Sequence, residues 1–152
     1  MKISIITPSY NQARFIERTI KSVLDQNYPD LEYIIMDGGS TDGTVEILQK
    51  YSDKITWKSE KDNGQSDAIN KGLKMATGDI VAYLNSDDTY ETGSLQKVVD
   101  FFENNKEAKW VTGKCKIINE KDEEIRKPIT FYKNLFLKNF SYSKLLSENF
   151  IS

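Results

Sequence analysis

The stretch "YIIMDGGSTDG", residues 33 to 43, changes abruptly from an apolar run to a polar segment that holds three glycines and two aspartates. The apolar half, 33–36, predicts a buried strand, because such runs are typical of strands covered on both faces. Glycine permits positive φ and the close approach of a backbone or a ligand, and aspartate hydrogen-bonds to a turn or to a ligand. The polar half is therefore a tight turn or the edge of a ligand site.

The same change from strand to polar turn and helix recurs along the chain. Strands are predicted at 3–7, 33–36, 55–58 and 80–84, and a short helix at 44–51. Three apolar stripes at helical spacing predict further helices, with the stripe residues Ile16, Ile20, Val23 and Leu24, then Ile69, Leu73 and Ala76, then Leu95, Val98, Val99 and Phe102. This alternation predicts an α/β fold, with a mainly parallel sheet wound by right-handed crossovers and flanked by helices.

The ends of these helices are marked by residues that favour helix termini. Asn11, Asp42 and Thr92 are predicted N-caps, because their side chains accept hydrogen bonds from the free N–H groups of a first helical turn. Gly78 is predicted to end the helix that contains Leu73, since glycine adopts the left-handed conformation common at that position.

Composition narrows the chemistry that the chain can perform. The 152 residues suit one domain, and a net charge of −2 with interspersed signs excludes the basic stripe of a nucleic-acid binder. No apolar run is long enough for a bilayer span or a signal peptide, so we expect a cytoplasmic protein. The single Cys115 excludes an intramolecular disulfide. Because histidine is absent, any catalysis or metal binding must rest on carboxylates.

Polar stretches follow all four predicted strands. They are "TPSYNQ" (7 to 12), "DGGSTDG" (37 to 43), "SEKDNGQSD" (59 to 67) and "NSDD" (85 to 88). Open α/β sheets bind ligands outside the carboxyl ends of their strands, so these stretches are expected to form one site. Neither the G-x-G-x-x-G fingerprint nor a phosphate-binding G-x-x-x-x-G-K-[ST] loop follows the first strand. Phosphates are therefore not held mainly by a glycine-rich loop.

A divalent metal held by carboxylates is the alternative way to bind phosphates. Asp87 and Asp88 offer hard oxygen ligands suited to Mn²⁺ or Mg²⁺, which often takes one or two protein carboxylates and completes its shell with diphosphate oxygens and water. Taken by itself, "NSDD" is equally compatible with a turn before a helix.

The ordered set of four motifs resembles the family 2 glycosyltransferases, which have the Rossmann-like GT-A nucleotide-diphospho-sugar fold. The resemblance runs from about residue 3 to about residue 104 and is carried by "TPSYNQARFIERTIKSVLDQNYPDLEYIIMDGGSTDGT" and "DNGQSDAINKGLKMATGDIVAYLNSDD". It implies metal-dependent transfer of a sugar from a nucleotide-sugar, usually a UDP-sugar, to the hydroxyl of a glycan or lipid-linked acceptor, commonly with inversion at the anomeric carbon.

The resemblance also implies the residues of a nucleoside pocket, which are Thr7, Pro8, Tyr10, Asp37 and Asp67. Asp37 corresponds to the family's aspartate that hydrogen-bonds the base. The family often has two consecutive aspartates here, and in this chain Gly38 takes the second place. One carboxylate suffices for the contact, so Asp37 is kept as the base-binding residue.

The "NSDD" segment corresponds to the family's metal-binding D-x-D motif. Asn85 replaces the leading aspartate and retains the ability to bond a ribose hydroxyl, while Ser86 is the variable position. Asp87 corresponds to the metal-coordinating aspartate, and Asp88 is expected to assist it or to cap a helix. The negative charge that develops on the leaving diphosphate needs such a metal and no histidine.

The remaining residues carry weaker patterns. Residues 109–119 predict a strand or hairpin, 120–127 a solvated charged turn, and the segment after Pro128 an aromatic-rich helix. That helix packs against the sheet or a further segment, or forms an acceptor- or membrane-facing surface that would bring the protein to the inner face of a membrane. The predicted division is a nucleotide-sugar-binding domain at 1–128 and the start of an acceptor-side segment at 129–152.

No carboxylate after the metal motif matches the family's catalytic base, which must take the proton of the acceptor hydroxyl. We therefore expect the base beyond residue 152 and the fold to be incomplete at the carboxyl end. Three functions stay open at this point: the donor domain of a glycosyltransferase, a nucleotide-sugar-binding module without turnover, and a nucleotidyltransferase-like or dehydrogenase-like α/β enzyme. The third is the weakest because both phosphate-loop fingerprints are absent.

Overall fold

The computed structural model describes residues 1–121 and 123–138. It divides into two compact units, Met1–Lys106 and Glu107–Ser152, and each is described by itself. The first unit contains all four predicted strands and every predicted site residue. It ends earlier in the chain than the nucleotide-sugar-binding domain expected at 1–128, and that domain boundary stays a prediction.

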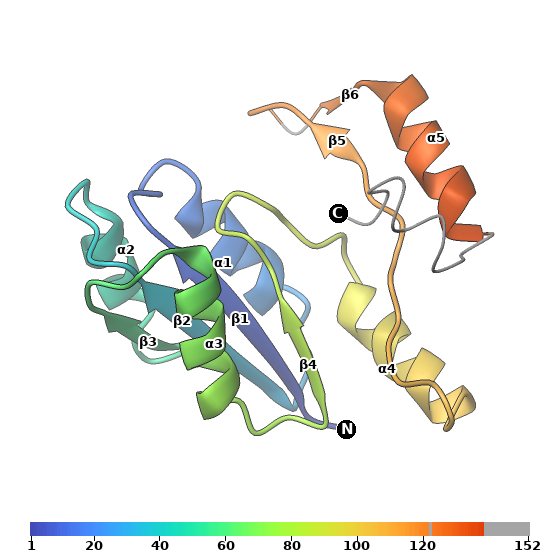
Figure 1. Cartoon of the computed structure of the whole chain (residues 1–152), viewed down its shortest axis with the longest axis horizontal. Helices are drawn as coiled ribbons and strands as arrows, with labels where there is room; N and C mark the ends of the chain where they lie inside the picture. The colour runs from blue at the N-terminus through green and yellow to red at the C-terminus, as the bar shows by residue number, and fades with distance from the viewer. Residues whose placement is uncertain (122, 139–152) are drawn as a thin grey trace. The chain divides into compact units, whose positions relative to one another are not determined.

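A parallel sheet of four strands forms the centre of the first unit (Figure 1). The strands are β1 (Ile3–Ser9), β2 (Leu31–Asp37), β3 (Thr56–Ser59) and β4 (Ile80–Tyr83), in the order β3-β2-β1-β4. The predicted α/β fold with a mainly parallel sheet is confirmed. At the carboxyl edge, Ser9 of β1 lies beside Asp37 of β2, which in turn lies beside Ser59 of β3. The register therefore brings the polar stretches after these strands to one edge of the sheet.

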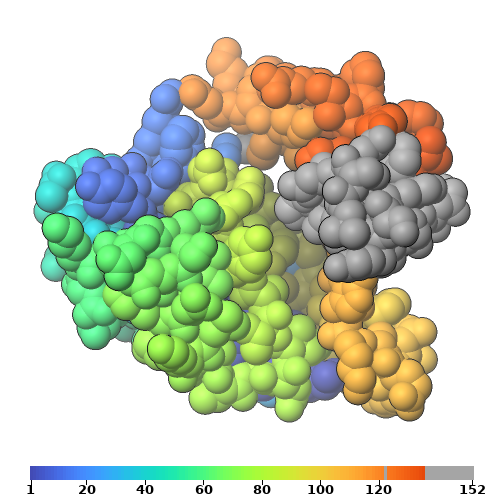
Figure 2. All heavy atoms as spheres, viewed as in Figure 1, coloured from blue at the N-terminus to red at the C-terminus, as the bar shows by residue number. Residues whose placement is uncertain are grey.

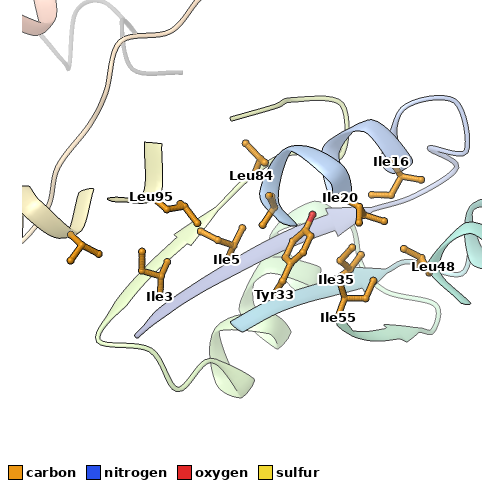
Figure 3. Close-up of a cluster of buried hydrophobic side chains, with 12 residues drawn as sticks. Ile3, Ile5, Ile16, Ile20, Tyr33, Ile35, Leu48, Ile55, Leu84 and Leu95 are labelled. Carbon is orange, nitrogen blue, oxygen red and sulfur yellow. The ribbon is translucent and has the colours of Figure 1, made fainter. Parts of the chain in front are cut away.

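Helices cover both faces of this sheet. They are α1 (Ile16–Leu24), α2 (Thr44–Lys50), α3 (Gln65–Met75) and α4 (Ser94–Asn104). The larger core lies on the face covered by α1, α2 and α4 (Figure 3). In it, the predicted stripe residues Ile16 and Ile20 of α1 pack with Ile5, Tyr33 and Leu48. Because every β1 residue from 3 to 9 is buried, both faces of this strand are covered, as its apolar run predicts.

The α3 helix packs on the opposite face through small residues. The stripe predicted for it is wrong at Leu73, whereas Ala76 packs against the core on this face. Ala68 and Gly72 are its buried residues, whereas Leu73 is 47% exposed. A Cβ at position 72 would lie 2.5 Å from Cγ2 of Ile6, so glycine lets the helix lie directly against β1. Close packing, not the largest apolar side chains, decides which face of α3 is buried. In Figure 2 the atoms of α3, drawn in green, cover the strands behind them.

The β4 strand also differs from its prediction. Its apolar sequence predicts coverage on both faces, yet Val81 is 43% and Tyr83 58% exposed within the described residues. These two side chains alternate with the half-buried Ile80 and Ala82, which pack against the larger core. The physical reason is position: β4 is an edge strand, and α3 packs on β1 and β2.

A network of hydrogen bonds closes the amino edge of the sheet around Glu32. Its carboxylate accepts hydrogen bonds from the Ser4 hydroxyl at 2.5 Å, the Thr77 N–H at 2.8 Å and the Lys2 ammonium at 3.0 Å. Burial raises the pKa of Glu32, but these hydrogen bonds outweigh it and lower the pKa to about 2. Gly78 belongs to this network, since its N–H donates to the Ser4 hydroxyl at 2.8 Å and a Cβ there would lie 2.7 Å from the N and Oγ atoms of Ser4. The prediction that it ends α3 is wrong, because α3 ends at Met75 with Ala76 as its C-cap and Gly78 does not have a positive φ.

The second unit contains an antiparallel hairpin and a helix. Strand β5 (Ile117–Ile118) pairs with β6 (Glu124–Ile125), and α5 spans Lys127–Lys138. The helix after 127 agrees with its prediction. Of the strand or hairpin predicted at 109–119, only Ile117–Ile118 is strand, and the turn predicted at 120–127 is wrong at 124–125, which forms the second strand of the hairpin. Among residues 1–121 and 123–138, no helix is both long and apolar enough to cross a bilayer. The aromatic-rich end beyond 138 lies outside the described residues.

Candidate functional site

The carboxylate of Asp37 organises the turn that follows β2. Asp37 is 2% exposed, and its Oδ2 accepts hydrogen bonds from the N–H groups of Gly39 (3.1 Å) and Ser40 (2.9 Å) and from the Ser59 hydroxyl (2.6 Å). The Ser40 hydroxyl donates to Oδ1 at 2.5 Å. These four donors come from the Asp37 turn and from β3. Asp37 therefore fixes the shape of this edge, and its predicted contact with a base stays a prediction.

The loop after β1 is joined to the same turn by Asn11. The Asn11 N–H donates to the Ser40 hydroxyl at 2.7 Å, and the Asn11 side-chain oxygen accepts the N–H of Thr41 at 3.0 Å. Asn11 has φ +51°, and α1 begins only at Ile16. The prediction that Asn11 caps this helix is therefore wrong, because its side chain is used to hold two loops together.

Asp42 is not the N-cap of α2, which is Gly43, but its side chain accepts the hydrogen bond from the first helical turn that the prediction describes. Its Oδ1 accepts hydrogen bonds from the N–H and the hydroxyl of Thr44, the first residue of α2, and its Oδ2 accepts the N–H of Ala13. Burial raises the pKa of Asp42, but these hydrogen bonds outweigh it and lower the pKa. Thr92 does not fulfil its predicted role, since α4 begins after Gly93 with no side-chain cap.

The predicted pocket residues at the end of β1 lie in very different surroundings. Thr7 is fully buried, and its hydroxyl lies 3.0 Å from the hydroxyl of Tyr33 inside the core. Pro8 is buried as well, whereas Tyr10 is 62% exposed. Between them, the Ser9 hydroxyl is buried and has no hydrogen-bond partner among the described residues. Tyr10 is therefore the side chain of these residues that is open to solvent, and the Ser9 hydroxyl is a buried polar group that sequence reasoning did not single out.

Asp67 lies in the first turn of α3 and is held by its neighbours. Its Oδ2 accepts the N–H of Asn63 at 3.1 Å and pairs with the ammonium of Lys71 at 3.2 Å. The Asn63 N–H and then the Lys71 ammonium lower the pKa of Asp67. Lys71 also pairs with Glu60 at 3.2 Å, which connects α3 to the segment after β3. Asp67 therefore stays ionised at neutral pH, with part of its side chain open to solvent.

Side chains of α1 hydrogen-bond to the backbone of the "NSDD" segment. The Thr19 hydroxyl donates to the carbonyl oxygens of Ser86 (2.9 Å) and Asp88 (2.8 Å), and the Arg18 guanidinium donates to the carbonyl of Asp87 at 3.3 Å. Thr19 is fully buried, so water does not compete for these hydrogen bonds. The sequence gives no signal for it, because Thr19 lies far from the motif in the chain.

Asn85 connects this segment to α3. Its side-chain oxygen accepts a hydrogen bond from the Gln65 amide at 2.7 Å, and its amide nitrogen donates to Oδ2 of Asp88 at 3.0 Å. The replacement of an aspartate by asparagine thus lets one side chain donate to a carboxylate and accept from an amide. The structure brings the third and fourth polar stretches together through the contact between Gln65 and Asn85.

The carboxylates of this segment fit a divalent metal. Asp87 and Asp88 are exposed, and no hydrogen bond or ion pair engages the Asp87 carboxylate among the described residues. Within the same residues there is no group of three or more acidic, cysteine or histidine side chains that could enclose a metal. The arrangement therefore suits an ion that takes one or two protein oxygens and obtains the remainder from a diphosphate and water.

Comparison with known proteins agrees with this geometry. A family model described as "Glycosyl transferase family 2" matches residues 4–150. The chain belongs to glycosyl transferase family 2. The putative teichuronic acid biosynthesis glycosyltransferase TuaG of Bacillus subtilis is 46% identical over 104 residues, which make up 65% of this chain and 41% of that relative.

Two solved structures share the fold of this family 2 chain. S. aureus TarS in complex with UDP has a TM-score of 0.63 and 25% identity, and the match covers 78% of this chain and 42% of that one. The mannosyltransferase PcManGT of Pyrobaculum calidifontis, in complex with GDP-Man and Mn²⁺, has a TM-score of 0.61 and 29% identity. The match covers 66% of this chain and 32% of that one. The chain spans less than half the length of each of these proteins. The predicted family and GT-A fold are confirmed.

Proposed function

We propose that this chain is the donor-binding part of a metal-dependent glycosyltransferase that transfers a sugar from a nucleotide-diphospho-sugar, with UDP as the nucleotide, to an acceptor hydroxyl. The observation that carries the proposal is the unengaged Asp87 carboxylate on a backbone held by Thr19 and Arg18 at the carboxyl edge of the sheet. Family membership favours this function over a binding module without turnover.

The residues at the end of β4 would hold the diphosphate through Mn²⁺ or Mg²⁺. A bound metal would stabilise the negative charge that develops on the leaving diphosphate. Asp87 would ligate the ion directly. Asp88 would lie beside it, oriented by the Asn85 amide, and Ser86 would present its backbone to the donor. Because Thr19 fixes the carbonyls of Ser86 and Asp88, little reorganisation is needed when the donor binds.

The nucleoside would lie over the ends of β1 and β2. Tyr10 is exposed enough to stack on a base or ribose, and the turn that Asp37 organises forms the adjacent wall. Asp67, at the start of α3, is the second carboxylate predicted to contact the nucleotide, and the Asn63 N–H and then the Lys71 ammonium lower its pKa. Thr7 and Pro8 would support this wall from within the sheet.

The acceptor side of the reaction is a further part of the proposal. A glycan or lipid-linked hydroxyl would attack the anomeric carbon with inversion, and the carboxylate base that takes its proton is expected beyond residue 152. We propose a cytoplasmic enzyme that meets its acceptor at the inner face of a membrane. Transfer assays on a protein extended at the carboxyl terminus, with several UDP-sugars, would test this part.

The donor site is tested by titrating UDP into the 152-residue chain, with saturating Mn²⁺ and with chelator. UDP at about 100 times its Kd adds roughly 2.7 kcal/mol of stability by mass action, so thermal unfolding gives a second readout. Asp87→Asn is expected to remove the metal-dependent part of binding. Asp30→Asn is the matched control, because it removes one exposed carboxylate at the amino edge of the sheet. Absence of nucleotide binding at saturating metal, or full metal dependence in Asp87→Asn, would contradict the proposal.

A further inference from the structure

In the turn after Asp37, Gly38 is the one of the three glycines whose backbone conformation does not call for glycine. Gly39 and Gly43 have φ of +84° and +100°, which favour glycine, but Gly38 is not among the residues with positive φ. A Cβ at position 38 would instead lie 2.9 Å from Oδ2 and 3.1 Å from Oδ1 and Cγ of Asp62. The space beside Gly38 is thus taken by the carboxylate of Asp62, which comes from the loop between β3 and α3.

Asp62 and Asp37 differ in how many of their carboxylate oxygens are already hydrogen-bonded. Its Oδ1 accepts the N–H of Gly64 at 2.8 Å, and no hydrogen bond reaches its Oδ2 within the described residues. The side chain is half-buried, whereas Asp37 is almost fully buried and receives four internal donors. Of the two carboxylates beside Gly38, Asp62 is the one with an oxygen available to a ligand.

The position of Asp62 in the sheet indicates which part of a nucleotide it would meet. Asp62 follows β3 and Asp87 follows β4, which are the two outer strands of the sheet. Three interstrand spacings of about 4.8 Å separate them, roughly 14 Å in all, which is the scale of an extended nucleoside diphosphate. With the diphosphate at Asp87, the base would reach the side of the sheet where Asp62 lies.

We propose that Asp62, from the space that Gly38 leaves open, is the carboxylate that accepts a hydrogen bond from the ring N–H of the base. This inference rests on the proposed function. An ionised carboxylate only accepts hydrogen bonds, so it favours a base whose ring nitrogen carries a hydrogen, as N3 of uracil does, over cytosine, whose N3 is an acceptor. Asp62 thereby determines base specificity, while Asp37 holds the turn against which the base lies.

The test measures Kd values of UDP, N3-methyl-UDP, 2′-deoxy-UDP and CDP for the full 152-residue chain in Mn²⁺. The variants are Asp62→Asn, which retains an oxygen for the Gly64 N–H, and Asp30→Asn as a charge control. Loss of a hydrogen bond to a charged group corresponds to about a 10- to 100-fold change in Kd. We expect that loss for UDP with Asp62→Asn and for N3-methyl-UDP with the unmodified chain, and no additional loss when the two changes are combined.

The same titrations separate failure of this inference from failure of the proposed function. If the unmodified chain binds no nucleotide, the proposed function fails and the inference with it. If it binds UDP but Asp62→Asn binds UDP equally well, the donor site stands and the inference is overturned. It is also overturned if Asp62→Asn removes the preference for UDP over 2′-deoxy-UDP, since the contact would then be to the ribose. A double variant, Gly38→Asp with Asp62→Ala, moves the carboxylate from position 62 to position 38. It is expected to regain the preference for UDP over CDP that Asp62→Asn loses.

Discussion

Asp37→Asn is expected to destabilise the fold strongly, because Asp37 is buried among donors. The carboxylate accepts four hydrogen bonds, and the amide would replace one of its oxygens by an NH₂ group. At Oδ2 that group would face the N–H groups of Gly39 and Ser40 and the Ser59 hydroxyl, and at Oδ1 it would face the Ser40 hydroxyl. Hydrogen bonds to a charged group contribute about 1.5–3 kcal/mol each but are not additive. We take that range as the expected loss, which is a large share of a typical domain's stability.

Urea unfolding followed by circular dichroism measures this loss, with Asp30→Asn as the exposed control. The corresponding decrease in Tm is roughly 3–12 °C for a chain of this size. UDP titration of the same variant, below its melting temperature, separates structure from binding. A loss of less than about 1 kcal/mol accompanied by complete loss of UDP binding would refute the structural role of Asp37, since a loss that small is what a single surface group contributes.

Three other substitutions test structural contacts outside the Asp37 network. Glu32→Gln is expected to cost up to about 3 kcal/mol at neutral pH, since the pKa of Glu32 falls from 4.5 to about 2 on folding. The unmodified chain's advantage should be complete above pH 4.5 and shrink as pH falls toward 2; urea midpoints that differ equally at every pH would contradict this. Gly72→Ala should lose about 1–2 kcal/mol despite alanine's helix propensity, because its Cβ would overlap Ile6; an unchanged Tm would argue against the close packing. Asp42→Ala should cost about 1 kcal/mol and leave UDP affinity unchanged, as expected of a helix cap; loss of affinity would make Asp42 a ligand contact.

Much of the fold follows from local sequence patterns. The apolar runs at 3–7 and 33–36 and the helical stripe of Ile16, Ile20 and Val23 were sufficient to predict β1, β2 and α1. These patterns are reliable because side chains repeat along a strand about every 2 residues and along a helix about every 3.6 residues. An element that borders a core must therefore place apolar residues at that spacing. The ends of the elements were less predictable, since Asn11 and Gly78 are used by long-range contacts and not by the nearest helix.

In the candidate site, too, some features follow from the sequence and others only from tertiary contacts. The sequence by itself determined that polar turns gather at one edge of a parallel sheet, because this depends on the alternation of strands and helices along the chain. Residue chemistry offered Asp87 and Asp88 as metal ligands, and the resemblance to the family's D-x-D motif implied that Asp87 is the one to test. Only the tertiary structure decided that Thr7 faces the core, that Thr19 supports the metal motif and that Gly38 makes room for Asp62. Each of these contacts joins residues from different strands, helices or loops. Their geometry is set by the register between strands and the packing of helices on the sheet, which no local pattern encodes.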